Sequence, residues 1–184
     1  MSSSRLTEVS DRALHEALAS SQRLGMLGDR SIDEVVEHAG AFVAALADIS
    51  GLVVDLGSGG GVPGLVIAVA RPDLRLLLID RRAARTDHLE RLVRRMELGG
   101  RVAVRCADAG DLALDPAPAA VVARGFGAPE VTASAAARLL RREGILVVSE
   151  PPDAGDRWRG ISGFERAVSP DPRVAVLHRV PRGT

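Results

Sequence analysis

Along the chain, segments with apolar residues at helical spacing alternate with short, nearly continuous apolar runs. Residues 82–98 and 129–142 carry apolar side chains at helical spacing, and Gly99 and Gly144 follow these segments as helix stops. Short, nearly continuous apolar runs are typical of strands that are covered on both faces. Such runs lie at residues 52–56, 74–80, 101–107, 120–123 and 145–149. Because these strands alternate with helices, the pattern predicts an α/β fold with a doubly wound, mostly parallel sheet.

The pattern differs at the two ends of the chain. Residues 11–21 predict a short helix, and Ser31-Ile-Asp-Glu34 predicts a second one that begins with a capping box. We therefore expect an N-terminal helical arm over residues 1–50, joined to a sheet-containing domain over residues 51–184. The whole chain is expected to form a single domain.

The C-terminal segment predicts an antiparallel strand pair. Residues 151–163 are rich in Pro, Gly and Asp, which is typical of a loop. Residues 164–168 and 174–180 then predict two short strands, separated by the turn Ser169-Pro-Asp-Pro172. Two strands separated by so short a connection must pair antiparallel.

Composition narrows the class of protein. The chain has 184 residues, a formal net charge of zero and a single cysteine, Cys106, so no disulfide within the chain is expected. No apolar run approaches the roughly 20 residues that a membrane span requires, and the first residues do not resemble a secretory signal. We expect a cytoplasmic monomer without a membrane segment or a metal site. Zero net charge means that any RNA contact must come from a local arginine patch.

The most informative stretch is the glycine-rich turn after the first strand, and it fits two registers. Gly59-x-Gly61-x-x-Gly64, followed by Asp80, satisfies the dinucleotide fingerprint of a nicotinamide-dependent oxidoreductase. The second register is Asp55-x-Gly57-x-Gly59-x-Gly61. In it Asp55 lies near the amino-acid half of an adenosyl ligand, and Asp80 accepts hydrogen bonds from the ribose hydroxyls. Asp55 would repel a pyrophosphate, and the antiparallel C-terminal pair departs from a purely parallel dinucleotide fold, so the second register is favoured.

The stretch Asp55-Leu-Gly-Ser-Gly-Gly-Gly-Val-Pro-Gly64, with Ala70-Arg-Pro72 after it, resembles the signature of the RsmG (GidB) family. The resemblance covers roughly residues 23–180. It implies a Rossmann-like class I methyltransferase that uses S-adenosylmethionine and methylates N7 of a guanine in small-subunit ribosomal RNA. Ribosomal RNA or the small ribosomal subunit is then the expected partner.

The resemblance also implies where the cofactor contacts fall. They are expected in the glycine loop, at the end of the second strand, after the third strand where the adenine should sit, and after the fourth strand. Together with the glycine register, this gives a set of cofactor-binding residues: Asp55, Gly57, Gly59, Gly61, Val62, Asp80, Ala107, Asp108 and Arg124.

Several family positions on the substrate side are altered. The family's Lys-Gly pair after the fifth strand is Glu150-Pro151 here, and a glutamate there should repel a phosphate backbone. The Arg-x-Glu motif of the third strand becomes Cys106-Ala-Asp108, and the N-terminal Arg-His motif becomes Glu37-His38. Cofactor binding is therefore better supported than RNA binding. A divergent relative that methylates a small molecule, or binds the cofactor without turnover, is the alternative, and a nicotinamide-dependent enzyme is a third.

No catalytic side chain is assigned from the sequence. Guanine N7 carries a lone pair and no proton, so its methylation needs positioning and no general base. His38 is the best placed of the four histidines, and Phe126 is the aromatic residue expected nearest the site. Three arginine clusters form either an RNA-facing surface or the solvated faces of two helices. They are Arg81/Arg82/Arg85, Arg91/Arg94/Arg95 and Arg138/Arg141/Arg142.

Overall fold

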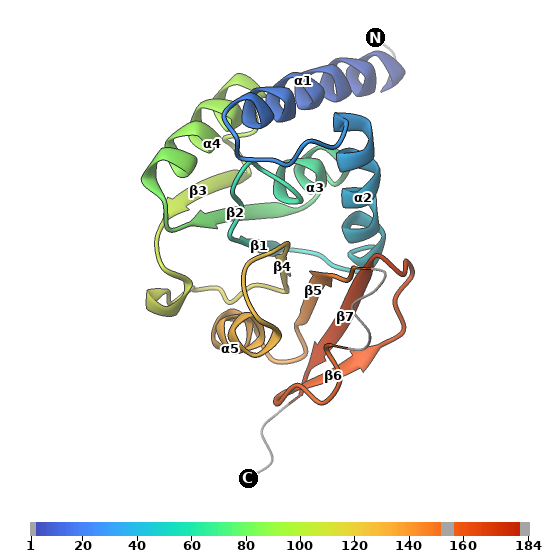
Figure 1. The fold of residues 1–184 in the computed structure, drawn as a ribbon, viewed down its shortest axis with the longest axis vertical. Helices are drawn as coiled ribbons and strands as arrows, with labels where there is room; N and C mark the ends of the chain where they lie inside the picture. The colour runs from blue at the N-terminus through green and yellow to red at the C-terminus, as the bar shows by residue number, and fades with distance from the viewer. Residues whose placement is uncertain (1–2, 152–156, 181–184) are drawn as a thin grey trace.

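One seven-stranded sheet forms the centre of the molecule (Figure 1), in a computed structural model that describes residues 3–151 and 157–180 and the side chains from residue 10 onward. The strand order is β3-β2-β1-β4-β5-β7-β6, and the first five strands in sequence are mutually parallel. β7 runs antiparallel to both β5 and β6, which confirms the predicted pair. The strands are β1 (Leu52–Leu56), β2 (Arg75–Asp80), β3 (Val102–Cys106), β4 (Ala120–Ala123), β5 (Ile145–Ser149), β6 (Phe164–Ala167) and β7 (Val174–Arg179).

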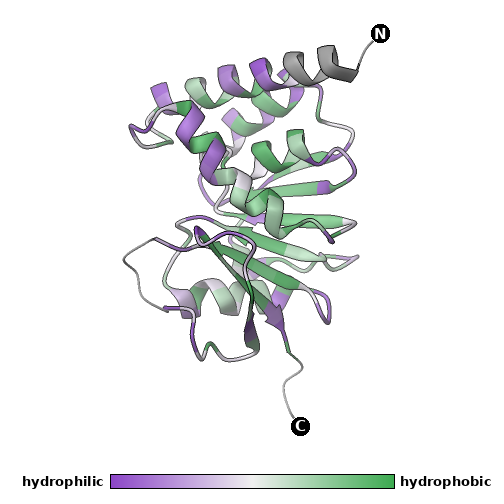
Figure 2. Cartoon of the chain, turned by 90° about the vertical axis from the view of Figure 1, so that its right-hand side faces the viewer, coloured by the Kyte–Doolittle hydropathy of each residue, from purple (hydrophilic) through white to green (hydrophobic). Residues whose placement is uncertain are grey.

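Helices cover the two faces of this sheet unequally (Figure 1). Four α-helices pack on one face, and α5 with the short 3-10 helix η1 covers the other. The four are α1 (Ser3–Arg23), α2 (Ile32–Ala45), α3 (Gly64–Ala70) and α4 (Ala83–Arg95); α5 is Pro129–Leu139 and η1 is Ala109–Asp111. Figure 2 shows apolar residues along most of the central strands, as expected for strands buried between two layers.

Several element ends differ from the sequence prediction for local reasons. α1 is longer than the expected residues 11–21. α4 stops at Arg95 because Glu97 adopts a left-handed φ of 57° and Leu98 N donates to Val93 O, closing the helix before the two glycines. α5 stops at Leu139, since Arg141 N donates to Pro118 O rather than continuing the helix. The predicted loop over residues 151–163 lies partly outside the described residues.

The N-terminal arm shares the core of the sheet. Ser31 caps α2 as predicted: its hydroxyl accepts from Glu34 N at 3.3 Å, and the Glu34 carboxylate accepts from Ser31 N at 2.9 Å. Leu18 of α1 and Phe42 of α2 are fully buried in the cluster that includes the strands. A buried hydrogen bond of 3.0 Å joins Ser21 Oγ and His88 Nε2, tying α1 to α4. The arm thus supports the elements that carry the glycine loop.

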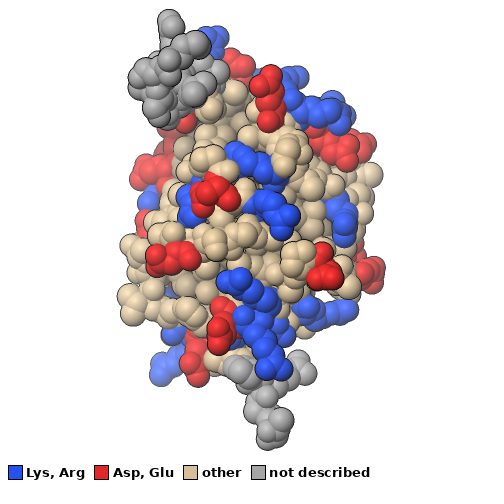
Figure 3. All heavy atoms as spheres, turned by 180° about the vertical axis from the view of Figure 1, so that it is seen from behind, with Lys and Arg blue, Asp and Glu red and all other residues tan. Residues whose placement is uncertain are grey.

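The topology collects one set of strand ends at a single edge of the sheet. Parallel β1 to β5 bring their carboxyl ends there, and antiparallel β7 brings its first residues to the same edge, where Glu150 N donates to Arg173 O at 2.8 Å. Ligands of open α/β sheets bind at such an edge. Acidic and basic side chains are interspersed over the back of the molecule (Figure 3), in keeping with the neutral net charge. No helix among the described residues has the length and hydropathy that crossing a bilayer requires.

Candidate functional site

The glycine loop after β1 is held in shape by hydrogen bonds within the chain. Gly57 N and Ser58 N both donate to Ile79 O, at 2.8 and 2.9 Å, and Ile79 N donates to Ser58 Oγ at 2.9 Å. Gly57, Gly59 and Gly61 have φ values of 72°, 51° and 96°, which other residues adopt only with strain. The glycines are therefore needed for the turn itself, and the turn is pinned to β2.

The Asp80 carboxylate at the end of β2 lies against the same loop. Its Oδ2 accepts from Gly59 N at 3.1 Å, and its Oδ1 accepts from Arg82 N at 3.0 Å. Arg85, from the first turn of α4, approaches Oδ2 with its guanidinium at 3.3 Å and leaves Asp80 only 5% exposed. The sequence predicted Asp80 as a ribose acceptor, and the structure places it beside Gly59 with a guanidinium over it.

Asp55 lies beneath the loop and is fully buried. Its Oδ2 accepts from Gly64 N at 3.0 Å, at the start of α3, whereas its Oδ1 has no hydrogen-bond partner among the described residues. Burial raises the pKa of the Asp55 carboxyl to about 7, against the opposing effects of the Gly64 and Ser58 hydrogen bonds. An unpartnered buried oxygen is costly, so this carboxylate is poised to accept a donor.

The Asp55 position also decides between the two registers of the loop. A dinucleotide fold needs free backbone N–H groups and a helix N-terminus for the pyrophosphate. Here the N–H groups of Gly57, Ser58 and Gly59 are already donated within the chain, and the Asp55 carboxylate occupies the start of α3. The geometry therefore disfavours the nicotinamide alternative.

Arg124 follows β4, the strand that pairs with β1 beside Asp55. It is half-buried, and within residues 3–151 and 157–180 its guanidinium has neither a hydrogen bond nor an ion pair. Burial lowers its pKa, while the charge of Asp55 raises it. Two neighbouring strand ends thus carry opposite charges that the described chain leaves incompletely satisfied.

The glycines of the loop serve different purposes. A Cβ at Gly57 would lie 3.0 Å from Phe126 Cδ2, and one at Gly59 would lie 3.5 Å from the Arg85 guanidinium. These two positions lie at the edge of the sheet, where Phe126 covers Gly57 and Arg85 covers Gly59. Gly61 faces the interior instead, where a Cβ would lie 2.5 Å from Leu65 Cδ1.

The remaining predicted residues divide between the edge and the core. Val62 is 3% exposed and packs its side chain into the core, so only its backbone can reach a ligand. Ala107 N donates to Asp80 O at 3.1 Å, which brings the end of β3 next to β2. Asp108 is exposed and caps η1 by accepting from Gly110 N at 2.9 Å. A cavity of about 390 Å³ opens beside Asp108 and Phe126 and reaches along α5.

Charged residues that sequence reasoning missed surround His38 at the β4–β5–β7 end of the edge. Burial lowers the pKa of His38, and the charges of Arg124, Arg173 and Arg30 lower it further. Arg173 is ion-paired with Asp171 at 2.7 Å and with Glu37 at 3.2 Å, and it holds the pKa of Asp171 at about 2. Arg30 and Arg173 belong to no recognisable sequence motif, and they come close to His38 only in the folded chain.

The structure also changes the interpretation of Glu150. The sequence predicted a free carboxylate that would repel phosphate, but Glu150 is 8% exposed and ion-paired with Arg166 of β6 at 2.5 Å. Arg166, which lies 16 residues further along the chain, neutralises the Glu150 charge. Among the described residues, no group of three or more His, Cys, Asp or Glu side chains is arranged to hold a metal ion.

Comparison with solved structures identifies the fold. A protein of Corynebacterium glutamicum superposes with a TM-score of 0.60 at 20% identity, covering 94% of this chain and 91% of that one. A SAM-dependent methyltransferase from Thiobacillus denitrificans, solved in complex with S-adenosyl-L-homocysteine, superposes with a TM-score of 0.52 at 26% identity. That match covers 62% of this chain and 48% of the other. The sheet and its helices therefore form the Rossmann-like fold of class I methyltransferases.

Comparison of sequences identifies the family. The ribosomal RNA small subunit methyltransferase G of Mycobacterium marinum is 33% identical over 141 residues, or 73% of this chain and 61% of that relative. The same enzyme of Nocardioides is 38% identical over 130 residues, or 64% of this chain and 51% of the relative. The chain thus spans little more than half the length of these relatives. A family model, rRNA small subunit methyltransferase G, matches residues 13–152, and the chain belongs to this GidB family.

Proposed function

We propose that the protein is an S-adenosylmethionine-dependent methyltransferase that transfers a methyl group to guanine N7 of small-subunit ribosomal RNA. The observation that carries the cofactor assignment is the pair of unsatisfied charges at the ends of β1 and β4. Asp55 Oδ1 lacks a donor and the Arg124 guanidinium lacks an acceptor within the described chain. The methionine part of the cofactor carries an ammonium and a carboxylate, and it complements both.

The other predicted positions extend this ligand along the edge. The ribose hydroxyls would replace the Arg85 guanidinium at Asp80, which lies beside Gly59. The adenine would lie near Ala107 and Asp108, where the cavity beside Phe126 opens. Relatives named as ribosomal RNA methyltransferases, and a neighbour solved with S-adenosyl-L-homocysteine, support this ligand.

Catalysis in this proposal consists of positioning. The bound cofactor supplies a sulfonium methyl group that passes in line to the nitrogen lone pair. Because guanine N7 has no proton to lose, the site needs no general base, and none is proposed. Asp55, Asp80 and Arg124 hold the cofactor at its two ends, and Phe126 over Gly57 shields the edge from water. Holding the reactants in line is worth several kcal/mol, about 7–11 in the best intramolecular reactions.

The proposed reaction also implies a partner and a cellular compartment. Ribosomal RNA, free or within the small ribosomal subunit, is the methyl acceptor, and the enzyme acts on it in the cytoplasm as a monomer. The positive charges of Arg30 and Arg124 near His38 support an anionic acceptor at this end of the edge.

Calorimetry separates the cofactor hypotheses. We expect S-adenosylmethionine and S-adenosylhomocysteine to bind and NAD not to bind. Arg124→Gln should weaken the sulfonium cofactor about tenfold by removing a charged hydrogen-bond donor, whereas the exposed Arg95→Gln is the matched control with no expected effect. Binding of NAD alone would overturn the cofactor assignment.

A methyl-transfer assay then tests the acceptor. Labelled S-adenosylmethionine is incubated with deproteinised small-subunit RNA and with intact small subunits, and incorporation is mapped to the modified base. We expect label on a guanine that becomes sensitive to cleavage at N7. Cofactor binding without transfer to either RNA would leave the fold and ligand standing and reject the acceptor.

A further inference from the structure

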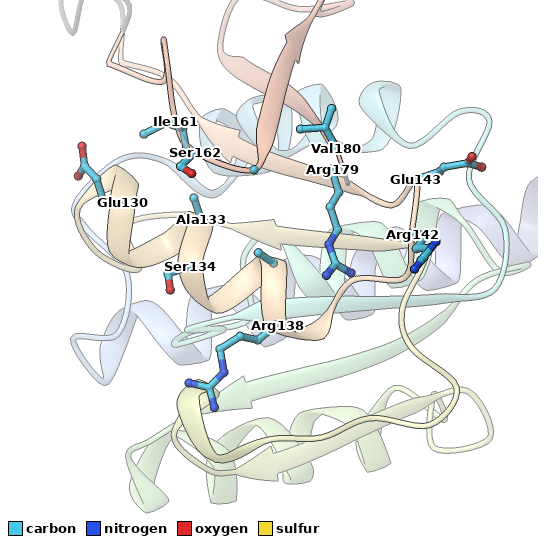
Figure 4. A pocket seen from close by; sticks show the side chains of 12 residues that line it. Glu130, Ala133, Ser134, Arg138, Arg142, Glu143, Ile161, Ser162, Arg179 and Val180 are labelled. Atoms are coloured by element: carbon cyan, nitrogen blue, oxygen red, sulfur yellow. The ribbon is translucent and has the colours of Figure 1, made fainter. Parts of the chain in front are cut away.

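A second cavity has none of the predicted cofactor residues in its lining. It is a groove of about 730 Å³ between α5 and the segment that connects residue 161 to β6, closed at one end by the last residues of β7 (Figure 4). Its long walls carry small residues: Ala133 and Ala137 on the α5 side and Gly163 opposite. It lies on the sheet face that carries one α-helix, whereas the other face carries four.

Three guanidinium groups border this groove, from Arg138, Arg142 and Arg179. Arg138 donates to Gly110 O and Arg179 donates to Leu140 O, so two of them are fixed in position by backbone carbonyls. Over residues 3–151 and 157–180 none of the three is ion-paired with a carboxylate. In Figure 4, Arg179 extends from the end of β7, Glu143 points away from the groove, and Glu130 lies at the end opposite to Arg142. The groove thus has a strongly cationic end.

The groove adjoins the cavity at the proposed cofactor edge across one ridge of α5. Glu130, Ser134 and Arg138 line both this groove and the smaller cavity beside Asp108 and Phe126. They stand four residues apart on α5, so they form one ridge along the helix. If one nucleotide base of a polyanionic chain lies at the cofactor edge of the sheet, the chain would cross α5 at Arg138. It would then reach Arg142 and Arg179.

We propose that this groove binds the sugar–phosphate backbone of a single-stranded segment of the RNA substrate, flanking the nucleotide that is methylated. The inference rests on the proposed RNA methyltransferase function. Guanidinium groups without acid partners are the usual phosphate ligands, and the Ser134 and Ser162 hydroxyls can bond phosphate or 2′-OH oxygens. Of the three arginine clusters in the sequence, this proposal uses the one at the end of α5, Arg138/Arg141/Arg142, and adds Arg179, a residue with no sequence signal.

Salt-dependent RNA binding tests the groove directly. Anisotropy of a fluorescent single-stranded RNA is measured for the wild type, for Arg142→Gln/Arg179→Gln and for the control Arg91→Gln/Arg95→Gln on α4. The control removes two exposed arginines of equal charge from the opposite face of the sheet. Loss of two phosphate contacts should lower the magnitude of the log–log salt slope by about 1.4 and the affinity about tenfold or more. The control should stay within about twofold.

The remaining measurements separate this proposal from the one it rests on. S-adenosylmethionine affinity should be equal in all three proteins. Arg142→Glu, at an exposed position, replaces the double variant if Arg179→Gln unfolds, and it should weaken RNA binding more than Arg142→Gln. Equal RNA losses in the groove variant and the control, or displacement of RNA by polyglutamate as readily as by RNA, would overturn the groove as an RNA site. A wild type that binds the cofactor but no RNA would overturn both the groove and the acceptor.

Discussion

The β1–β2–β3 half of the sheet edge differs from the β4–β5–β7 half in how its polar groups are satisfied. In the first half, the loop N–H groups donate to Ile79 O and Asp80, and Asp108 caps η1. In the second half, Arg124 has no acceptor within the described residues, and Arg173 is neutralised by Asp171 and Glu37. The first half is a preformed cradle, and the second is a set of charges that the described residues balance only in part.

The two halves are held together by interactions of different kinds. A cradle fixed by backbone hydrogen bonds tolerates little change, because each N–H group left unpaired costs about 1–3 kcal/mol. Side-chain ion pairs at a partly exposed edge can be exchanged more freely. Glu150, just after β5, is held in such a pair by Arg166 of β6 at 2.5 Å. The two halves should therefore respond differently to substitution.

The largest effect is expected from Gly57→Val in the cradle. The left-handed φ of 72° and Phe126 Cδ2 at 3.0 Å leave no room for a side chain, and a valine would occupy the space of the cofactor. We expect S-adenosylmethionine affinity to fall by about 100-fold or more, the equivalent of about 3 kcal/mol, in calorimetry.

Gly160→Val is the matched control for this substitution. Gly160 has a similar φ of 71°, and no atom lies within 4 Å of the position that a Cβ would take, so it carries the same backbone strain without the contact. Both variants should lose stability in urea, Gly57→Val more because of the Phe126 contact, and only Gly57→Val should lose the cofactor. Equal cofactor affinities in the two variants would contradict the site.

The sequence predicted the cradle and missed much of the second half for the same physical reason. A strand, a glycine turn and a capped helix are specified by neighbouring residues, so β1, β4 and β5 have the predicted ends, and the Ser31 cap is confirmed. The pairing of Arg173 with Glu37 joins residues 136 positions apart, and no local pattern records such a contact. Arg85 over Asp80 could have been predicted, because α4 begins directly after β2.

The second effect is a pH dependence that arises from Asp55. Its folded pKa, about 7, is raised above the ordinary aspartate value of 3.8, so the folded state binds the proton more tightly than the unfolded chain. The stability contributed by this group is therefore greatest at low pH and falls as pH rises toward about 7, by about 1.4 kcal/mol per unit. Above about pH 7 both states are ionised and the dependence ends.

Asp55→Asn isolates this contribution. The amide oxygen can still accept from Gly64 N, and all other ionisable residues are the same in the two proteins. Free energies of unfolding in urea, measured from about pH 5 to about pH 8, should show the wild type losing about 2–3 kcal/mol relative to Asp55→Asn. A difference that does not change with pH would show that Asp55 is ionised throughout this range.

The third effect, Asp80→Ala, tests the ribose end of the cradle. The substitution removes the acceptor of Gly59 N and the proposed acceptor of the ribose hydroxyls. We expect cofactor affinity to fall by about 1–3 kcal/mol, measured by calorimetry. Asp73→Ala removes an exposed acid, paired with Arg71 away from the loop, and should leave affinity unchanged. Unchanged affinity in Asp80→Ala would place the ribose elsewhere.

The smallest effect is expected at Glu150, in the second half. A free carboxylate at this position would repel RNA, and Glu150→Gln would then strengthen RNA binding and alter its salt dependence. The observed Glu150 is buried and ion-paired with Arg166 at 2.5 Å, so it presents almost no net charge to a ligand. Removing both charges with Glu150→Gln/Arg166→Gln keeps the pair neutral and should therefore change RNA affinity by less than about twofold. A gain of about tenfold in this double variant would mean that Glu150 repels RNA without being neutralised by Arg166.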